Sequence, residues 1–427
     1  MSLKQQLIKS FLGVGVMRLA AIPIGLATSV LLARFLGPEQ FGQYAFIMAL
    51  VPLLALPITG GMQTLLTREV ASYSQAGRWS LYKGALNAAH GWAISISLCI
   101  FAIYVIFAFG IAVIPTSGKW SLLSIALLML PLLGLNTARN GVIKGLGMPA
   151  MAELPGMLIQ PLIALGVLSG VAFTVGLNAN SAIWVQVVSV AFTFSIATVI
   201  FFKLRPTEAV SVKGEYDLRA WGSALTPFIL LSLVGTFNAQ LGILTLGLFS
   251  SDEQVAALRV AERGSHFVAL SLTIVNLVIS PHIVNAFKSN DMKLLQRLSR
   301  QSARGAFAIA LPIGLLLIFF GDSLISVLFG EEYSEISYLP LIILVIGQLF
   351  NVFFGSVGFL LAMTGNEKQS FKGQVFAVLV NLFLCWALVP TMGAVGAAIA
   401  VSSSIIFWNA ILGYLVYRKV GIRPSAA

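Results

Sequence analysis

The chain has 427 residues, of which 58% are hydrophobic and only 10% are charged. Soluble proteins carry about 25% charged residues, so the composition excludes a soluble globular protein and indicates a membrane protein. The net charge of +11 would suggest a nucleic-acid partner in a soluble protein, but here its distribution along the chain decides its meaning.

Long uncharged stretches predict an all-α membrane protein. Seven stretches of more than 20 residues lack Asp, Glu, Lys and Arg, and the two longest, Leu154–Phe202 and Gly373–Tyr417, have 49 and 45 residues. One membrane-spanning helix needs about 20 apolar residues, so each of these two holds a pair of spans. Transmembrane β-barrels have alternating segments of about ten residues instead. The pattern predicts twelve spans, near residues 11–33, 41–61, 88–113, 120–138, 152–174, 181–202, 223–248, 264–286, 305–329, 338–362, 372–390 and 394–417.

The basic residues predict the orientation of these spans. With the N terminus in the cytoplasm, 21 Lys and Arg residues lie on the cytoplasmic side and four on the other, while Arg18 lies inside the first span. Basic residues in short loops stay cytoplasmic, so this distribution places both termini there. The cations are therefore a topology signal, and we expect no nucleic-acid partner.

Two short segments repeat at half the length of the chain. Phe35–Ala45 follows the first span and Phe249–Arg259 follows the seventh, and both contain a Phe and a Glu-Gln pair at an offset of 214 residues. Six spans in each half give both halves the same orientation, as in transporters built from parallel repeats. We predict an N-terminal six-helix lobe at 1–203, a cytoplasmic linker at 204–222 and a C-terminal six-helix lobe at 223–427.

Patterns typical of catalysis and metal binding are missing from the sequence. It contains no phosphate loop of the form G-x-x-x-x-G-K-[ST], no D-x-D pair, and three histidines without ligand spacing. No loop outside the cytoplasm is long enough to fold into a catalytic domain. The sequence therefore predicts a protein that is not an enzyme and that uses neither a cofactor nor a metal ion.

Polar residues inside the predicted spans are the candidates for substrate binding, because ionisable groups are costly in the bilayer and tend to mark function. In the first span, Arg18 and Ser29 belong to one stripe of small and polar residues. Arg18 either lines a central cavity or extends along the helix to the cytoplasmic headgroups, and the sequence leaves both interpretations open.

The eighth span has the longest polar stripe. Its members recur at helical spacing and are Arg259, Glu262, Arg263, His266, Thr273 and Asn276. A stripe of this length is expected to face protein or water, and the alternative is an interfacial ion cluster at the outer end of the helix. Gln240 belongs to a weaker polar stripe in the seventh span. Together with Arg18 and Ser29, these residues are the predicted substrate-binding site.

The segment Leu31–Tyr44, with the sequence LLARFLGPEQFGQY, closely resembles the signature of Wzx-type polysaccharide flippases. These share a superfamily with multidrug exporters of the MATE type, and the resemblance extends over the whole chain in length and predicted spans. It implies a MATE-like fold. It also implies transport of an undecaprenyl-pyrophosphate-linked oligosaccharide, which is an O-antigen, capsule or exopolysaccharide repeat unit. Transport would run from the cytoplasmic to the periplasmic leaflet of the bacterial inner membrane.

The same resemblance implies the partners of the protein. They are the lipid-linked oligosaccharide, membrane lipid, H⁺ or Na⁺ as coupling ion, and a polysaccharide polymerase with its chain-length regulator. Arginine suits pyrophosphate because its planar group donates paired hydrogen bonds. Arg18, Arg259 and Arg263 are thus the expected headgroup ligands. An ion-coupled multidrug exporter is the alternative, and it would favour buried acids in place of these cations.

Overall fold

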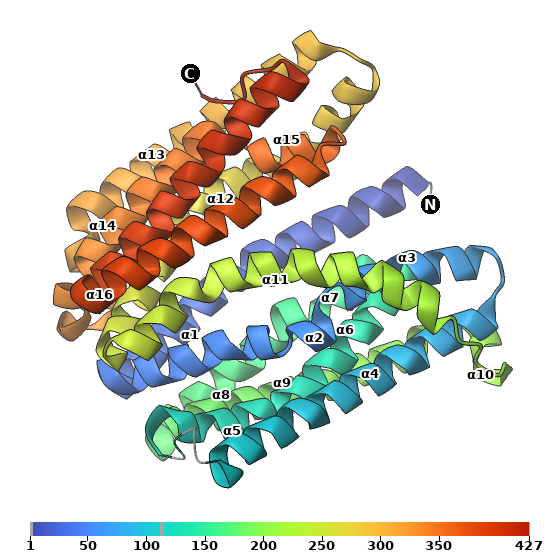
Figure 1. Cartoon of the computed structure of the whole chain (residues 1–427), viewed down its shortest axis with the longest axis horizontal. Helices are drawn as coiled ribbons and strands as arrows, with labels where there is room; N and C mark the ends of the chain where they lie inside the picture. Colours follow the sequence, from blue (N-terminus) through green and yellow to red (C-terminus); the bar gives the residue numbers. More distant parts are fainter. Residues whose placement is uncertain (1–2, 112–114, 116, 427) are drawn as a thin grey trace. The chain divides into compact units, whose positions relative to one another are not determined.

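The computed structural model of the chain describes residues 3–111, 115 and 117–426. Helices account for nearly all of these residues, and no β-strand occurs among them (Figure 1). The predicted all-α class is confirmed.

Nine stretches in the described part of the chain are long and apolar enough to cross a membrane. They are Gly13–Gln75, Trp79–Gly110, Gly118–Gly145, Pro149–Thr174, Ala179–Leu204, Leu218–Phe249, Met292–Phe329, Glu331–Leu361 and Lys368–Val420. The first and the last each contain a glycine that separates two helical rods, and the 37-residue helix α12 (Asp252–Lys288) is not among the nine. The polytopic membrane class is confirmed, while the count of twelve spans stays a prediction.

Two glycines interrupt the longest helices. Helix α1 (Leu3–Leu54) breaks at Gly37, which has φ 70° and ψ 171°, and α16 (Glu367–Val420) breaks at Gly393, which has φ 54° and ψ −131°. Glycine adopts positive φ without steric cost, so each break occurs where the chain can turn. After the second break, Gln254 Oε1 accepts a hydrogen bond of 2.8 Å from the Ala394 N–H, an amide that the interrupted helix leaves without a helical partner.

The chain forms two compact units. Unit 1 contains Met1–Leu36 and Ile47–Thr236, and unit 2 contains Gly37–Phe46 and Phe237–Ala427. The division falls inside α11 (Leu218–Phe249), and the segment Gly37–Phe46 is grouped with unit 2. The lobe and linker boundaries expected from hydropathy, after residues 203 and 222, stay predictions.

Unit 1 is built around α6 (Met129–Gly145), which packs against α3 (Met62–Gln75), α4 (Trp79–Val105) and α9 (Ala179–Leu204). Small residues allow close packing, because an ideal Cβ placed on Gly141 would lie 2.9 Å from the Gln63 carbonyl oxygen. The shorter helices of the unit are α2 (Leu56–Thr59), α5 (Ser121–Leu127), α7 (Pro149–Leu154), α8 (Gln160–Thr174) and α10 (Glu208–Ser211).

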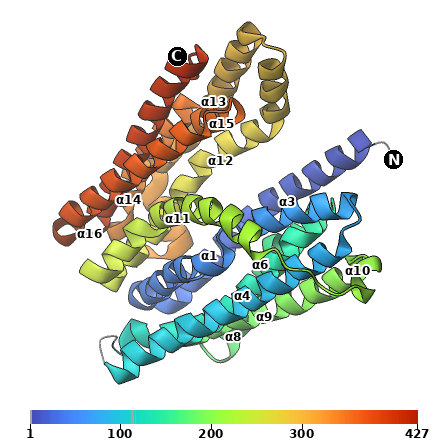
Figure 2. The ribbon, with the colours of Figure 1, turned by 45° about the vertical axis from the view of Figure 1, so that its right-hand side comes forward.

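Unit 2 consists mainly of long helices. Helix α12 packs against α13 (Met292–Phe329) and α14 (Glu331–Phe354), and α14 also packs against α16. The short helix α15 (Val357–Met363) lies against α16. Figures 1 and 2 show α13, α14 and α16, coloured orange to red, running side by side.

The two repeated segments of the sequence contact each other within unit 2. An ideal Cβ on Gly42, from the first copy, would lie only 1.7 Å from the carbonyl oxygen of Asp252, in the second copy. The buried Phe41 ring packs edge-on against Tyr333 with a centroid distance of 6.1 Å. Phe46 packs against Gly247, where an ideal Cβ would lie 2.0 Å from its ring. The motif that identifies the first half of the sequence is therefore part of the core of unit 2.

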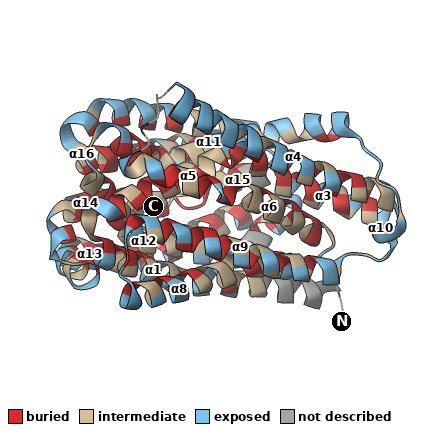
Figure 3. Ribbon diagram, turned by 90° about the horizontal axis from the view of Figure 1, so that it is seen from below, coloured by how far each residue is buried: buried red, intermediate tan, exposed pale blue. Residues whose placement is uncertain are grey.

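Large apolar side chains cover much of the surface of the helices. Phe109, Phe173 and Phe319 are 70%, 77% and 71% exposed, and Figure 3 shows exposed residues along the outward faces of many helices. Soluble monomers rarely expose extended apolar surface, whereas lipid-facing helices do. These faces agree with a protein that is surrounded by hydrocarbon.

Candidate functional site

The polar stripe predicted in the eighth span lies on α12 and begins with an ion pair. Arg259 Nη1 lies 3.1 Å from Glu262 Oε2, and the two side chains are 20% and 14% exposed. Residues three apart are neighbours on a helix surface, so the spacing itself brings these two groups together. The stripe is thus anchored by a pair whose charges cancel.

Arg263 follows on the same stripe but has different surroundings. Its side chain is exposed, and the ion pairs found within the described residues do not include it. His266 is exposed one turn further on, and its Nδ1 contacts the Glu262 carbonyl oxygen. Because Glu262 is engaged by Arg259, this part of α12 carries a net positive charge at Arg263.

The C-terminal part of the stripe, at Thr273 and Asn276, forms hydrogen bonds with other groups of the protein. The Thr273 hydroxyl donates to the Ala269 carbonyl oxygen at 3.4 Å, and the Asn276 side chain accepts a hydrogen bond from Ser356, which precedes α15. Both α12 side chains are half-buried. Ser356 was not predicted, because nothing in the sequence links it to a residue 80 positions earlier.

Gln240 lies on the part of α11 that belongs to unit 2. Its Oε1 is buried and accepts no hydrogen bond from the described residues. Close by in sequence, Asn238 Oδ1 accepts a hydrogen bond of 2.9 Å from Asn381 Nδ2 on α16. Asn381 was missed because it lies in an uncharged stretch and has no polar stripe around it.

Arg18 and Ser29 lie on α1 in unit 1, whereas the other predicted site residues lie in unit 2. Arg18 is exposed and Ser29 is buried, with 5% exposure. The structure therefore brings Arg259 and Glu262 together, extends the α12 stripe through Arg263 and His266, and assigns Arg18 and Ser29 to the other unit. An exposed Arg18 is compatible with both predicted roles, which are to line a central cavity or to extend to the cytoplasmic headgroups.

Unit 1 contains a polar cluster of its own, which was not predicted from the sequence. Arg139, on α6, stacks on the Phe194 ring of α9 at 4.5 Å and donates to the Thr198 hydroxyl. Its Nε is buried without a hydrogen-bond partner, as is Nε2 of His90 on α4. In the sequence, Arg139 is one of the 21 basic residues predicted on the cytoplasmic side, and its aromatic neighbours are more than 50 residues away.

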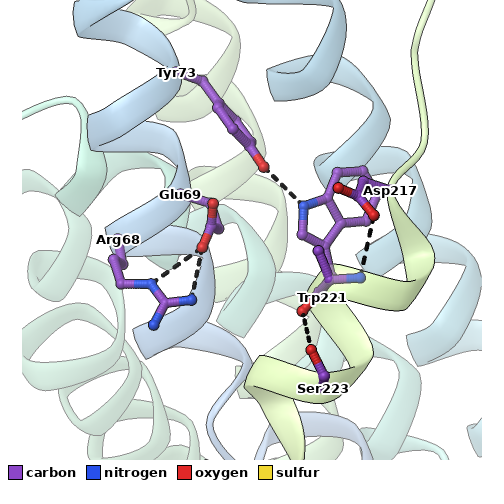
Figure 4. A network of polar contacts seen from close by, with 7 residues as sticks. Arg68, Glu69, Tyr73, Asp217, Trp221 and Ser223 are labelled. Atoms are coloured by element: carbon purple, nitrogen blue, oxygen red, sulfur yellow. Dashed lines mark hydrogen bonds and ion pairs between the residues drawn. The ribbon is translucent and has the colours of Figure 1, made fainter.

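Unit 1 also contains a cavity of about 500 Å³ between α3, α4 and the first three turns of α11. On one side, Trp221 Nε1 donates a hydrogen bond of 2.9 Å to the Tyr73 hydroxyl, which ties α11 to α3 (Figure 4). Glu69 lines the cavity, and its Oε1 accepts hydrogen bonds from Arg68 at 3.1 and 2.7 Å. The remaining lining is almost entirely apolar. Apolar and alanine residues at helical spacing are typical of ordinary helix packing, so this cavity could not be predicted from the sequence.

Metal chemistry has no evident location in the part of the chain that the structure describes. No group of three or more His, Cys, Asp or Glu side chains is close enough there to hold a metal ion.

Comparison with known proteins adds a family and two relatives. A family model described as "Polysaccharide biosynthesis protein" matches residues 31–338. The probable low-salt glycan biosynthesis flippase Agl15 of Haloferax volcanii is 24% identical over 41% of this chain and 37% of its own length. The capsular polysaccharide biosynthesis protein CapF of Staphylococcus aureus is 24% identical over 57% of this chain and 61% of its own length. The matched regions thus cover less than two thirds of either relative.

Solved structures agree on the fold. A multidrug resistance MATE family transporter of the MOP superfamily, in an inward-facing conformation, aligns with a TM-score of 0.79 and 14% identity over 95% of this chain and 98% of that one. The lipid II flippase MurJ, in an inward closed conformation, aligns with a TM-score of 0.75 and 16% identity over 94% and 87%. The predicted MATE-like fold is confirmed, and at these identities the likeness concerns the fold alone.

Proposed function

This chain belongs to the family of polysaccharide biosynthesis proteins, and we propose on that basis that it is a flippase for a lipid-linked oligosaccharide. The substrate is an undecaprenyl-pyrophosphate-linked repeat unit of an O-antigen, capsule or exopolysaccharide. It moves from the cytoplasmic to the periplasmic leaflet of a bacterial inner membrane by alternating access. A sugar pyrophosphate cannot cross hydrocarbon unaided, so the protein must offer it polar and cationic side chains.

The charge of the α12 stripe is the observation that carries this proposal. Glu262 is engaged by Arg259, which leaves Arg263 as an exposed cation on a stripe that continues through His266. An anionic headgroup complements this arrangement, whereas a cationic drug would meet like charge. Arginine can hold a pyrophosphate through two parallel N–H donors.

The candidate residues take different roles in this proposal. Arg263 and His266 contact the headgroup, and Arg18 is a separate candidate cation within unit 1. Arg259 and Glu262 hold each other and orient the stripe. Thr273 and Asn276 support the helix through their protein contacts. Ser29 is buried in unit 1, and Gln240 offers its Oε1 to the sugars. The protein carries out transport without a chemical step, so we propose that it is not an enzyme.

The partners follow from this function. H⁺ or Na⁺ supplies the coupling, and a polysaccharide polymerase with its chain-length regulator uses the product on the periplasmic side. The alternative function is ion-coupled multidrug export, because multidrug transporters of the MATE family share this fold. Such exporters of cations need acids in the membrane, and on the α12 stripe the only acid is already paired.

Deletion of the gene separates the two functions. We expect the deletion strain to lose surface polysaccharide and to accumulate lipid-linked repeat units in the cytoplasmic leaflet, with unchanged tolerance to cationic drugs. Lipid extracts analysed by mass spectrometry and a drug-susceptibility panel measure both outcomes. Lower drug tolerance with intact surface polysaccharide would show that the protein is a multidrug exporter and not a flippase.

A further inference from the structure

The cavity of unit 1 offers a hydrocarbon environment. Its lining repeats at helical spacing, with Leu65, Leu66 and Glu69 on α3 and Ala85, Ala89 and Trp92 on α4. Its few polar groups are already engaged. Glu69 is bound by Arg68, and the Trp92 indole N–H donates to the Pro57 carbonyl oxygen at 2.8 Å. A buried water needs two to four polar partners, so this cavity does not hold water well. Its volume of about 500 Å³ lies in the range of ligand-binding sites.

Charges of both signs flank one end of the cavity. Asp217 precedes the lining residue Trp221 by four positions, and Arg219 precedes the lining residue Gly222 by three. Asp217 is the residue before α11, and positions two apart differ by about 200° around a helix, so Asp217 and Arg219 lie on opposite sides of the lining face at the N-terminal end of α11. Asp217 Oδ1 caps the helix by accepting from the Ala220 N–H at 3.1 Å, and both side chains are exposed. Such an end complements a headgroup that carries one positive and one negative charge.

We propose that this cavity binds one acyl chain of a zwitterionic phospholipid with an ammonium headgroup, of the phosphatidylethanolamine type. The chain fills the apolar space between α3, α4 and α11. The phosphate lies toward Arg219 and the ammonium toward Asp217. Van der Waals packing against the apolar walls holds the acyl chain, because bilayer hydrocarbon is as apolar as the cavity, and the exposed charges select the headgroup.

The walls of the cavity identify its occupant as a resident lipid and not as transported cargo. All lining residues belong to unit 1, and the segment before α11 is fastened to α4. Lys83 Nζ donates to the carbonyl oxygens of Val210 and Val212, each at 2.8 Å, and the Glu215 N–H donates to the Ser80 carbonyl oxygen at 3.0 Å. A transported lipid must enter and leave in every cycle, whereas a site with fastened walls retains its ligand.

Gly222 provides the sharpest test, because an ideal Cβ there has no atom within 4 Å and a side chain would enter the open space. The full-length protein is reconstituted with phosphatidylethanolamine or phosphatidylglycerol, extracted in detergent and examined by native mass spectrometry. We expect the unchanged protein to retain a single phosphatidylethanolamine. Gly222→Leu should retain it about tenfold less well, which corresponds to 1.4 kcal/mol of lost affinity. The control is Gly91→Leu, on the exposed face of α4, where a Cβ also meets nothing within 4 Å.

A second measurement uses the unchanged chain, so that it does not depend on the folding of a variant. A phosphatidylethanolamine with a photoactivatable acyl chain should crosslink to peptides from α3, α4 or the start of α11. Arg219→Gln should lower the preference for phosphatidylethanolamine over phosphatidylglycerol about two- to fivefold, as expected for an exposed charge. Crosslinks confined to other helices would overturn the proposal. So would equal retention of phosphatidylglycerol by the unchanged chain, retention by Gly222→Leu equal to that of Gly91→Leu, or displacement by undecaprenyl phosphate. Displacement by undecaprenyl phosphate would assign the cavity to the transported lipid, whereas the other outcomes do not bear on whether the protein flips oligosaccharides.

Discussion

Arg259 and Arg263 lie one turn apart on the same stripe of α12 and differ in what surrounds them. Arg259 is bound to Glu262, and both side chains are largely covered. Removing one partner of such a pair leaves the other charge unsatisfied, which is costly in a protein interior. Arg263 is exposed and belongs to none of the ion pairs in the described part of the chain, so we propose that its charge is available to a ligand. We therefore separate a positioning arginine from a binding arginine.

Replacing Arg263 tests this separation. Arg263→Ala should reduce transport about tenfold or more, since a hydrogen bond to a charged group contributes about 1.5–3 kcal/mol, while the amount of protein in the membrane stays normal. Arg263→Lys should retain part of the activity, because it keeps the charge and loses the paired donors. Surface polysaccharide normalised to membrane protein measures the effect.

The matched variant is Arg259→Ala, which exposes Glu262 without its partner and should mainly lower the amount of folded protein. If Arg263→Ala displays polysaccharide normally, the α12 cation does not contact the substrate. If it disappears from the membrane as Arg259→Ala does, its role is structural.

At the scale of single residues, the sequence predicted spacing but not partners. Helical periodicity was sufficient to place Arg259, Glu262 and Arg263 on one stripe, because neighbours on a helix are set by spacing alone. The bond between Asn276 and Ser356, and the stacking of Arg139 on Phe194, join residues far apart in the sequence. Such contacts depend on how helices pack, which one sequence does not reveal.

Among the elements, the segment Gly37–Phe46 differs most from what its position in the sequence suggests. The repeat pattern assigned it to the N-terminal half, yet it is grouped with unit 2 and meets the second copy of the repeat at Asp252. Hydropathy predicted that helices lie on both sides of it. It did not predict this grouping, because a short segment carries little apolar pattern of its own. This contact explains why the motif has a glycine at position 42, because a Cβ there would clash with the Asp252 carbonyl oxygen.

Substitution of Gly42 should therefore destabilise the protein. A Cβ there would lie 1.7 Å from the Asp252 carbonyl oxygen, so the backbone must shift. Overpacking of this kind costs about 1–3 kcal/mol or more, and we expect Gly42→Ala to lower the thermal midpoint of the detergent-solubilised protein.

Gly166→Ala is the control, because a Cβ on this α8 residue meets nothing within 4 Å and should leave the midpoint unchanged or slightly higher. An unchanged midpoint in Gly42→Ala would show that the two repeated segments are not held by this contact.

For the whole molecule, composition and long uncharged stretches were sufficient to predict a polytopic helical protein, and the nine candidate stretches within the described residues agree. The breaks at Gly37 and Gly393 coincide with boundaries between predicted spans, and both occur where the sequence offers a glycine. What composition does not determine is the division into units, which crosses α11 and depends on tertiary packing. The cavity was equally unpredictable, since it is formed by apolar faces of three helices that meet only in the folded chain.

The orientation of the chain is the remaining prediction for the molecule as a whole. The excess of cations on one side places the linker in the cytoplasm and the loops before α9 and within α16 outside. Lys213, Asn180 and Met392 are suitable reporters, because all three are exposed. Gly214 is less suitable, since a Cβ there would lie 3.3 Å from the backbone of Gly84.

Single cysteines at these positions, in a chain with Cys99 and Cys385 replaced by alanine, test the orientation with a membrane-impermeant maleimide. In intact cells with a permeabilised outer membrane, Asn180→Cys and Met392→Cys should be labelled, and Lys213→Cys should be labelled only after lysis. The buried Cys385 of the unchanged chain should stay unlabelled in the folded protein and react after denaturation, which controls for access. Labelling of Lys213→Cys in intact cells would show that the orientation is opposite to the predicted one. The cytoplasmic loading side of the proposed flippase would then have to be the opposite face.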